Sequence, residues 1–263
     1  MARYHSFIKF EGTMGGLTFA EGPHGDGIVK AKNRSYQPTA EGTWRNARLF
    51  GGGASTLCKH FRRSFMRVAS QFTHQDTCGR LNARFRTAMD LSSQRLGRQG
   101  FDLLLCPEAL AGFPFHSQLS VLEVLSARLL EPLDLHAIRE HVRWMVPEFT
   151  RSDLKSVPDG ATHFQLVLVA TQVSPAAPDA EGTSYVQTLP VDANSAGICY
   201  SALYALDAPT YEAVSLEVVP GRHLPTPDAM AVVVCAGILY GRMVKDKFLP
   251  NKKGSALDVM GVG

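Results

Sequence analysis

The sequence Ala-Met-Ala-Val-Val-Val-Cys-Ala-Gly-Ile-Leu-Tyr, residues 229–240, is the longest apolar run in the chain. It is shorter than the roughly 20 residues that a membrane-spanning helix needs. The run therefore predicts a buried β-strand rather than a membrane segment. We accordingly expect no membrane insertion.

A second strand is predicted at residues 162–173, where Phe164, Leu166, Leu168 and Ala170 alternate with polar or smaller residues. Turns rich in Pro, Ala, Gly and Asp separate it from further strand candidates at residues 185–191, 198–206 and 213–219. A last hairpin is expected to turn at residues 251–254 and return through residues 256–260. This spacing favours an antiparallel β-sandwich over residues 99–263. Residues 138–145 fit either a short helix or an irregular strand.

The region before this domain, residues 37–98, has the pattern of basic amphipathic helices. One face of the first helix is apolar, with Leu57, Phe61, Phe65, Val68 and Phe72 at helical spacing. A second helix is expected from about Thr77 to Leu91, with Leu81, Phe85, Ala88 and Met89 directed inward, and the two helices are expected to form a hairpin. The predicted basic face consists of Lys59, Arg62, Arg63, Arg67, Arg80 and Arg84.

Three consecutive glycines, residues 51–53, precede this helix and are expected to interrupt an earlier helical start at residues 43–49. A glycine-rich loop ahead of a helix is also able to cradle phosphate through backbone amides. The stretch lacks the lysine of a P-loop, so a helix break with a Ser/Thr cap is the favoured interpretation.

The first 36 residues are predicted to form a glycine-rich β-arm. Strand-like runs alternate with glycine turns, but the apolar side chains are too few for an independent core. Such an arm is expected to lie on another surface, which makes it the candidate self-assembly element. Its residues are Phe7, Ile8, Phe10, Gly12, Gly15, Gly16, Leu17, Phe19, Ile28 and Val29.

Composition places the 263-residue chain among globular proteins, with 45% hydrophobic and 19% charged residues. The overall fold class is predicted to be α+β. Residues 1–100 contain 16 Lys and Arg against 6 Asp and Glu, whereas the remainder contains 11 against 18. This asymmetry fits a basic segment for nucleic acid, or complementary ends that dock between copies.

No pattern in the sequence predicts catalysis. The five cysteines (Cys58, Cys78, Cys106, Cys199 and Cys235) form no CxxC pair, and no Cys/His cluster has zinc-ligand spacing. There is also no nucleophile elbow of the GxSxG type. We therefore expect neither a metal nor a cofactor, and no enzymatic activity.

The N-terminal residues 1–10 carry Arg3, His5 and Lys9 within their only apolar run. A signal peptide needs a continuous apolar core, so none is expected here. The protein is therefore expected to be made in the cytoplasm. Its later release as part of a particle stays an open alternative.

The stretches Ile8-Lys9-Phe10-Glu11 and Gly12-Thr13-Met14-Gly15-Gly16-Leu17-Thr18-Phe19 resemble the opening of an uncharacterised protein family found in Bacteroidota genomes. Thr43-Trp44-Arg45-Asn46, Phe50-Gly51-Gly52 and Asp159-Gly160-Ala161-Thr162-His163 extend the resemblance along the chain. The segment around residues 103–114 departs from the family pattern. The resemblance implies basic helices and a strand-rich tail, but no activity, cofactor or catalytic residue.

These patterns together favour a non-enzymatic structural subunit that binds copies of itself to form a filament, tube or virion-like particle. Two alternatives stay open. The basic helices fit a nucleic-acid-binding accessory protein, and the predicted sandwich fits a ligand- or carbohydrate-binding module.

Overall fold

The computed structural model describes residues 2–4, 12–14, 17–21, 27–31, 41–64, 66–72, 76–90, 100–131, 133–181, 184–189, 191, 195–221 and 226–263. The chain divides into two compact units, residues 1–45 and 46–263. The predicted boundary near residue 98 falls inside the second unit, because helices and strands there share one hydrophobic cluster.

The first unit contains a four-stranded antiparallel sheet with the order β1-β4-β3-β2. Its strands are β1 (Ala2–Tyr4), β2 (Gly12–Met14), β3 (Leu17–Glu21) and β4 (Gly27–Ala31). The central pair β3 and β4 aligns Phe19 with Val29. Strands β3 and β4 fall in the stretches that the sequence marks as extended.

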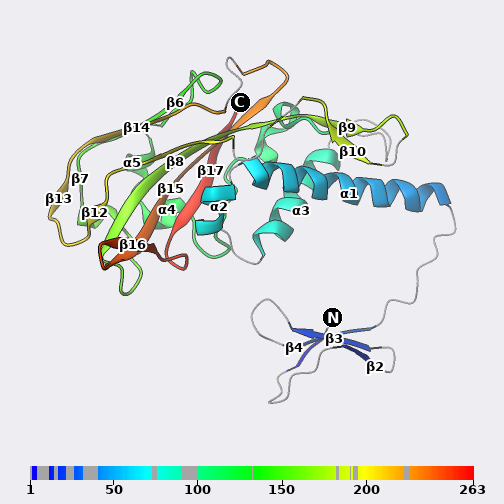
Figure 1. The fold of residues 1–263 in the computed structure, drawn as a ribbon, viewed down its shortest axis with the longest axis horizontal. Coiled ribbons are helices and arrows are strands. Elements are labelled where there is room, and N and C mark those ends of the chain that lie inside the picture. Colours follow the sequence, from blue (N-terminus) through cyan, green and yellow to red (C-terminus); the bar gives the residue numbers. More distant parts are fainter. Residues whose placement is uncertain are drawn as a thin grey trace. The chain divides into compact units, whose positions relative to one another are not determined.

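The second unit is built around two long antiparallel strands, β8 (His163–Val173) and β15 (Ala231–Val244). Figure 1 shows β8, β15 and β17 side by side in its centre. On one side β8 pairs with β11 (Gly197–Tyr200) and β12 (Tyr204–Ala205). On the other side β15 pairs with β16 (Lys247–Pro250) and β17 (Ala256–Val262), which completes a six-stranded sheet.

Both faces of this sheet are covered, which explains why its central strands are apolar on both sides. Successive side chains of a strand point to opposite faces. Phe164, Leu166, Leu168 and Ala170 contribute to one hydrophobic cluster, whereas Val167 and Val169 belong to the other. The apolar run at residues 231–240 divides between the clusters in the same way, so it is buried on both faces, as a central strand requires.

Three helices contribute to the cluster on the Val167 face: α1 (Glu41–Ser64), α2 (Met66–Phe72) and α3 (Thr77–Asp90). Leu57, Phe61, Val68 and Phe72 are all buried there, as their helical spacing predicts. Phe65 lies outside the described residues. Leu81 and Phe85 of α3 join the same cluster, and the Phe85 ring lies edge-on to those of Phe61 and Phe101.

The predicted helix break at residues 51–53 is wrong, because α1 runs through all three glycines. The physical reason is visible at Gly53, which is buried against the ring of Tyr185. A Cβ atom at Gly53 would lie 2.8 Å from two carbons of that ring. At this position the glycine permits close packing rather than a turn, and a phosphate-binding loop ahead of a helix start does not exist there.

The opposite cluster is shared with a three-stranded sheet of order β14-β6-β5. Its strands are β5 (Leu133–Asp134), β6 (Val142–Val146) and β14 (Val214–Val218), so the ambiguous stretch at residues 138–145 ends in a strand. Trp144 on β6 is fully buried and donates its Nε1–H to the Leu129 carbonyl at 2.6 Å. The short helices α4 (Val121–Val124) and α5 (Ala127–Leu130) complete this layer.

The remaining elements are short. Two strand pairs form between β7 (Phe149–Thr150) and β13 (Thr210–Tyr211), and between β9 (Ala176–Pro178) and β10 (Tyr185–Gln187). Single 3₁₀ turns span Leu103–Leu105, Pro107–Ala109 and Arg151–Asp153. Helices and antiparallel sheets thus coexist in one chain, and the predicted α+β class is confirmed.

The hairpin between β15 and β16 is not predicted by the sequence. Strand β15 continues to Val244, and the turn is made by Lys245 and Asp246, with φ values of 49° and 62°. Two-residue hairpin turns with positive φ at both positions usually contain Asn-Gly or Asp-Gly. Lys-Asp carries no such signal, so the sequence pattern does not indicate that β15 extends beyond Tyr240.

Candidate functional site

Five of the ten candidate assembly residues, Gly12, Leu17, Phe19, Ile28 and Val29, lie in the four-stranded sheet of the first unit. Leu17 is 41% exposed, and Phe19, Ile28 and Val29 are half-buried. Gly12 on β2 has a φ of 128°, a backbone conformation that side-chain-bearing residues rarely adopt. Phe7, Ile8, Phe10, Gly15 and Gly16 lie outside the described residues.

The hydrogen-bonding pattern of this sheet leaves two edge strands. Strand β1 pairs only with β4, and β2 pairs only with β3, among the described residues of the unit. The outer backbone groups of an edge strand are a template for pairing with a further strand. The unit therefore presents two such edges together with partly exposed apolar side chains.

The predicted basic face divides into exposed and internally bonded residues. Lys59 and Arg63 on α1 and Arg84 on α3 are exposed, whereas Arg62 is half-buried. Within the described residues, no acidic side chain pairs with Lys59, Arg63 or Arg84. Arg67 belongs to α2, but its side chain is outside the described part of the structure.

Arg80 does not belong to a solvated basic face. Its Nη1 and Nη2 groups donate to the carbonyls of Pro114 and Phe115, both at 2.8 Å, and its Nε lies 3.3 Å from Asp76 Oδ2. The guanidinium also lies 5.0 Å from the centre of the Phe113 ring. Arg80 therefore joins α3 to the segment at residues 113–115, a role that helical periodicity does not predict.

The positively charged side chains on α1 affect the pKa of a neighbouring histidine, His60. Partial burial, followed by the charges of Arg63 and Lys59, lowers the pKa of the His60 imidazole. At neutral pH His60 is therefore uncharged. The positive charge of this helix surface therefore comes from its lysine and arginines rather than from His60.

Two cysteines meet on the helical side of the second unit. Cys58 Sγ on α1 lies 3.9 Å from Cys78 Sγ on α3. The spacing of this pair in the sequence indicates that both cysteines face the core, since each is three residues before a core residue of its helix, Phe61 and Leu81 respectively. Residues three apart lie on the same helix face, so the predicted helical hairpin places both cysteines on facing sides of the two helices.

A buried carboxylate lies on β17. Asp258 is 7% exposed, and its Oδ2 accepts a hydrogen bond from the Val121 amide at 2.8 Å. Its Oδ1 is buried without a hydrogen-bond partner. Burial, and to a smaller degree the nearby Glu123, raise the pKa of Asp258 to about 6, although the Val121 amide and Arg80 act in the opposite direction.

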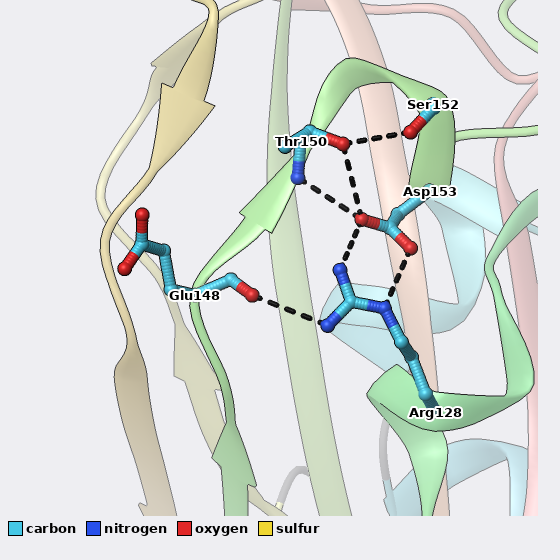
Figure 2. Close-up of polar contacts among 5 residues, drawn as sticks. All are labelled: Arg128, Glu148, Thr150, Ser152 and Asp153. Atoms are coloured by element: carbon cyan, nitrogen blue, oxygen red, sulfur yellow. Dashed lines mark hydrogen bonds and ion pairs between the residues drawn. The ribbon is translucent and has the colours of Figure 1, made fainter.

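A second polar cluster, shown in Figure 2, links α5 to the turn after β7. Arg128 binds both carboxylate oxygens of Asp153, with Nε 2.8 Å from Oδ1 and Nη2 in contact with Oδ2. Asp153 Oδ2 also accepts the Thr150 amide at 3.0 Å, which caps the 3₁₀ turn at Arg151–Asp153. These contacts, led by Arg128, lower the pKa of Asp153 to about 2.

Both carboxylates accept a hydrogen bond from a backbone amide. Asp153 is engaged by a cation and a backbone amide, and Asp258 accepts the amide of Val121, the first residue of α4. In the described part of the chain, no group of three or more His, Cys, Asp or Glu side chains is placed to bind a metal ion. No helix in that part is long and apolar enough to cross a membrane.

Comparison of the chain with protein-family models, curated proteins and solved structures gave no match. No family is assigned on this basis, and the candidate surfaces are defined by the residues of this chain alone.

Proposed function

We propose that the protein is a non-enzymatic structural subunit that self-assembles into a homopolymer, such as a filament, tube or virion-like particle. The observation that carries this proposal is the four-stranded sheet of the first unit, with its open edges at β1 and β2. A unit of residues 1–45 buries only a small fraction of its surface and is marginally stable by itself. A second surface that covers its apolar side chains would therefore stabilise it.

The exposure of apolar side chains in this sheet supports another copy of the protein as the binding partner. Leu17 is exposed, and Phe19, Ile28 and Val29 are only half-buried. A strand added at β1 or β2 would satisfy backbone groups of the edge, and apolar side chains would be covered at the same time. When the added surface is an unlike part of another copy, repetition of the contact gives rings or helical polymers.

We also propose a role for each part of the fold. The N-terminal sheet is the assembly arm, α1–α3 include a helical hairpin, and the six-stranded and three-stranded sheets act as a sandwich-like body. On the basis of the motif at residues 12–19, we also propose that the chain belongs to the uncharacterised Bacteroidota family. This membership implies no activity.

The proposal is tested by removing the arm from the protein and, separately, by changing one residue in it. A chain that starts at Gln37 is expected to fold but remain monomeric in size-exclusion chromatography, with helix and sheet signals retained in circular dichroism. The full-length variant Leu17→Lys is expected to shift the population from assemblies toward monomers. If the shortened chain instead loses its circular dichroism signal and aggregates, the arm is part of the subunit's own core and the proposal is wrong.

The exposed Lys59, Arg63 and Arg84, which no described acidic side chain pairs, favour one alternative, a nucleic-acid-binding accessory protein. We expect weak binding of mixed-sequence DNA or RNA at physiological ionic strength. Tight, saturable binding that is lost in the double variant Arg63→Glu, Arg84→Glu would favour this alternative. Arg80 is unsuitable for such a test because its guanidinium holds two backbone carbonyls.

A further inference from the structure

Cys58 and Cys78 are positioned by different helices that the hydrophobic core holds in place. Leu57 and Phe61 flank Cys58 on α1, and Leu81 follows Cys78 on α3; all three are buried in one cluster. The two Sγ atoms are 3.9 Å apart, and Cys58 Sγ also lies 3.8 Å from the Cys78 carbonyl oxygen. A disulfide has an S–S bond of about 2 Å, so side-chain rotation with a small helix shift has to close the remaining distance.

The two thiols differ in their access to solvent. Cys58 is 1% exposed, whereas Cys78 is half-buried. Burial, followed by the effect of Cys78, raises the pKa of the Cys58 thiol to about 12, and Arg62 one helical turn away acts in the opposite direction. A buried thiol of this kind is a poor first nucleophile toward a dissolved oxidant, so the more accessible Cys78 thiol has to react first.

The other three cysteines have different surroundings. Cys106 and Cys235 are buried, and Cys199 is half-buried. The Cys106 thiol donates to the Asp102 carbonyl at 3.5 Å, and the Cys199 thiol contacts the carbonyl of the next residue, Tyr200. Cys58 and Cys78 differ from these by combining close sulfur atoms with one solvent-accessible member.

We propose that Cys58 and Cys78 are a peroxide-reactive thiol pair that closes to an intramolecular disulfide between α1 and α3. This inference is independent of the proposed assembly function. It assigns Cys78 as the thiol that meets the oxidant and Cys58 as the thiol that resolves the product.

The chemistry balances with a hydroperoxide as the oxidant. The sulfur of Cys78 attacks one peroxide oxygen, the O–O bond breaks, and the thiol proton goes to the departing oxygen; the products are a sulfenic acid and an alcohol, or water when the oxidant is hydrogen peroxide. Cys58 sulfur then attacks the sulfur of the sulfenic acid. The S–S bond forms, the S–O bond breaks, and the hydroxyl leaves as water with the Cys58 proton. Two thiols lose two electrons in total, which reduce the peroxide.

The direct test uses the full-length protein, reduced, freed of reductant and treated with hydrogen peroxide near stoichiometric amount. After denaturation and alkylation, mass spectrometry is expected to find three alkylated cysteines of the five and a peptide pair joined through Cys58 and Cys78. The oxidised protein should also melt higher, by on the order of 5–10 °C, because the bond closes a loop between residues 20 positions apart. Five alkylated cysteines, or a link between another pair, would overturn the proposal.

Single variants separate the two roles. In Cys58→Ala the sulfenic acid at Cys78 is expected to persist and to be captured by dimedone, whereas Cys78→Ser should show no oxidation of Cys58 at the same peroxide dose. Cys199→Ser is the matched control, since Cys199 is also half-buried, and it should form the disulfide like the unaltered protein. Oxidation of Cys58 in the absence of Cys78 would contradict the assigned order. Should Cys58→Ala fail to fold, the peptide link in the unaltered protein decides the proposal.

Discussion

At the scale of single residues, Asp153 and Asp258 show how the same side chain acquires opposite properties in one fold. Asp153 is stabilised as a carboxylate by Arg128 and the Thr150 amide, whereas Asp258 is buried with one oxygen unpartnered. Their pKa values move to about 2 and about 6, on either side of the ordinary value. The two residues therefore affect stability in separate pH ranges.

Asp153→Asn is expected to lower the free energy of unfolding at pH 7 by about 1 kcal/mol, since solvent screens the half-exposed Arg128. The folded-state pKa is depressed, so the contribution is present above about pH 4 and is lost as the pH falls toward 2. Denaturant unfolding at pH 7 and pH 3 measures the difference between the variant and the unaltered protein. Glu148→Gln is the control, because the contact of Glu148 with Arg128 is made by its backbone carbonyl (Figure 2). An equal loss in both variants would contradict the assigned role.

Asp258→Asn is expected to change the free energy of unfolding at pH 7 in the opposite direction, that is, to raise it. The folded-state pKa is raised, so the protonated form favours folding; that stability is full below about pH 4 and is lost as the pH rises through 6. At pH 7 the variant should be more stable than the unaltered protein, by about 2 kcal/mol, and near pH 4 the two should unfold alike. Thermal unfolding across this range measures the effect. A variant that is less stable at pH 7 would show that the Val121 amide needs a charged acceptor.

At the scale of elements, α1 shows that the meaning of a glycine depends on what packs against it. Gly52 is exposed, and no atom lies within 4 Å of the place that a Cβ atom would take there. At Gly53 the same atom would lie 2.8 Å from the ring of Tyr185. The adjacent positions share one helix and one residue type. They differ only in their tertiary surroundings.

Gly52→Ala is therefore expected to stabilise the protein by about 0.5–1 kcal/mol, the difference in helix propensity between the two residues. Gly53→Ala gains the same propensity but forces the Tyr185 ring or the helix to move, and it should be less stable than Gly52→Ala by about 1–3 kcal/mol. Melting temperatures of the two variants measure this difference in stability. Equal stabilisation of both would mean that the Tyr185 ring moves aside without loss of stability.

At the scale of the whole molecule, the charge asymmetry along the chain bears on the proposed assembly. Residues 1–100 carry an excess of positive charge and the rest an excess of negative charge. Contacts between unlike parts of neighbouring copies would be attractive, and attraction between exposed charges is screened by salt.

If complementary charge contributes to the proposed assembly, raising the salt concentration from about 0.05 to 0.5 M should shift the protein toward smaller species, because the Debye length falls to a few ångströms. Sedimentation velocity at several salt concentrations measures this shift. Potassium glutamate and sodium chloride at equal ionic strength serve as mutual controls for specific ion effects. Assemblies that persist or grow in high salt would instead point to apolar contacts and strand pairing as the only attraction.

The sequence alone determined the features that depend on periodicity. The spacing of Leu57, Phe61, Val68 and Phe72 identified them as core residues, although they are divided between α1 and α2, and the apolar run at residues 229–240 identified a central strand. Tertiary structure decided what depends on neighbours distant in the chain. The ring of Tyr185 packs against Gly53 within α1, Arg80 donates to the carbonyls of Pro114 and Phe115, and the Cys58 and Cys78 sulfur atoms lie close together. Local pattern encodes which side of an element is apolar, whereas the identity of the contacting group is set only when the elements pack together.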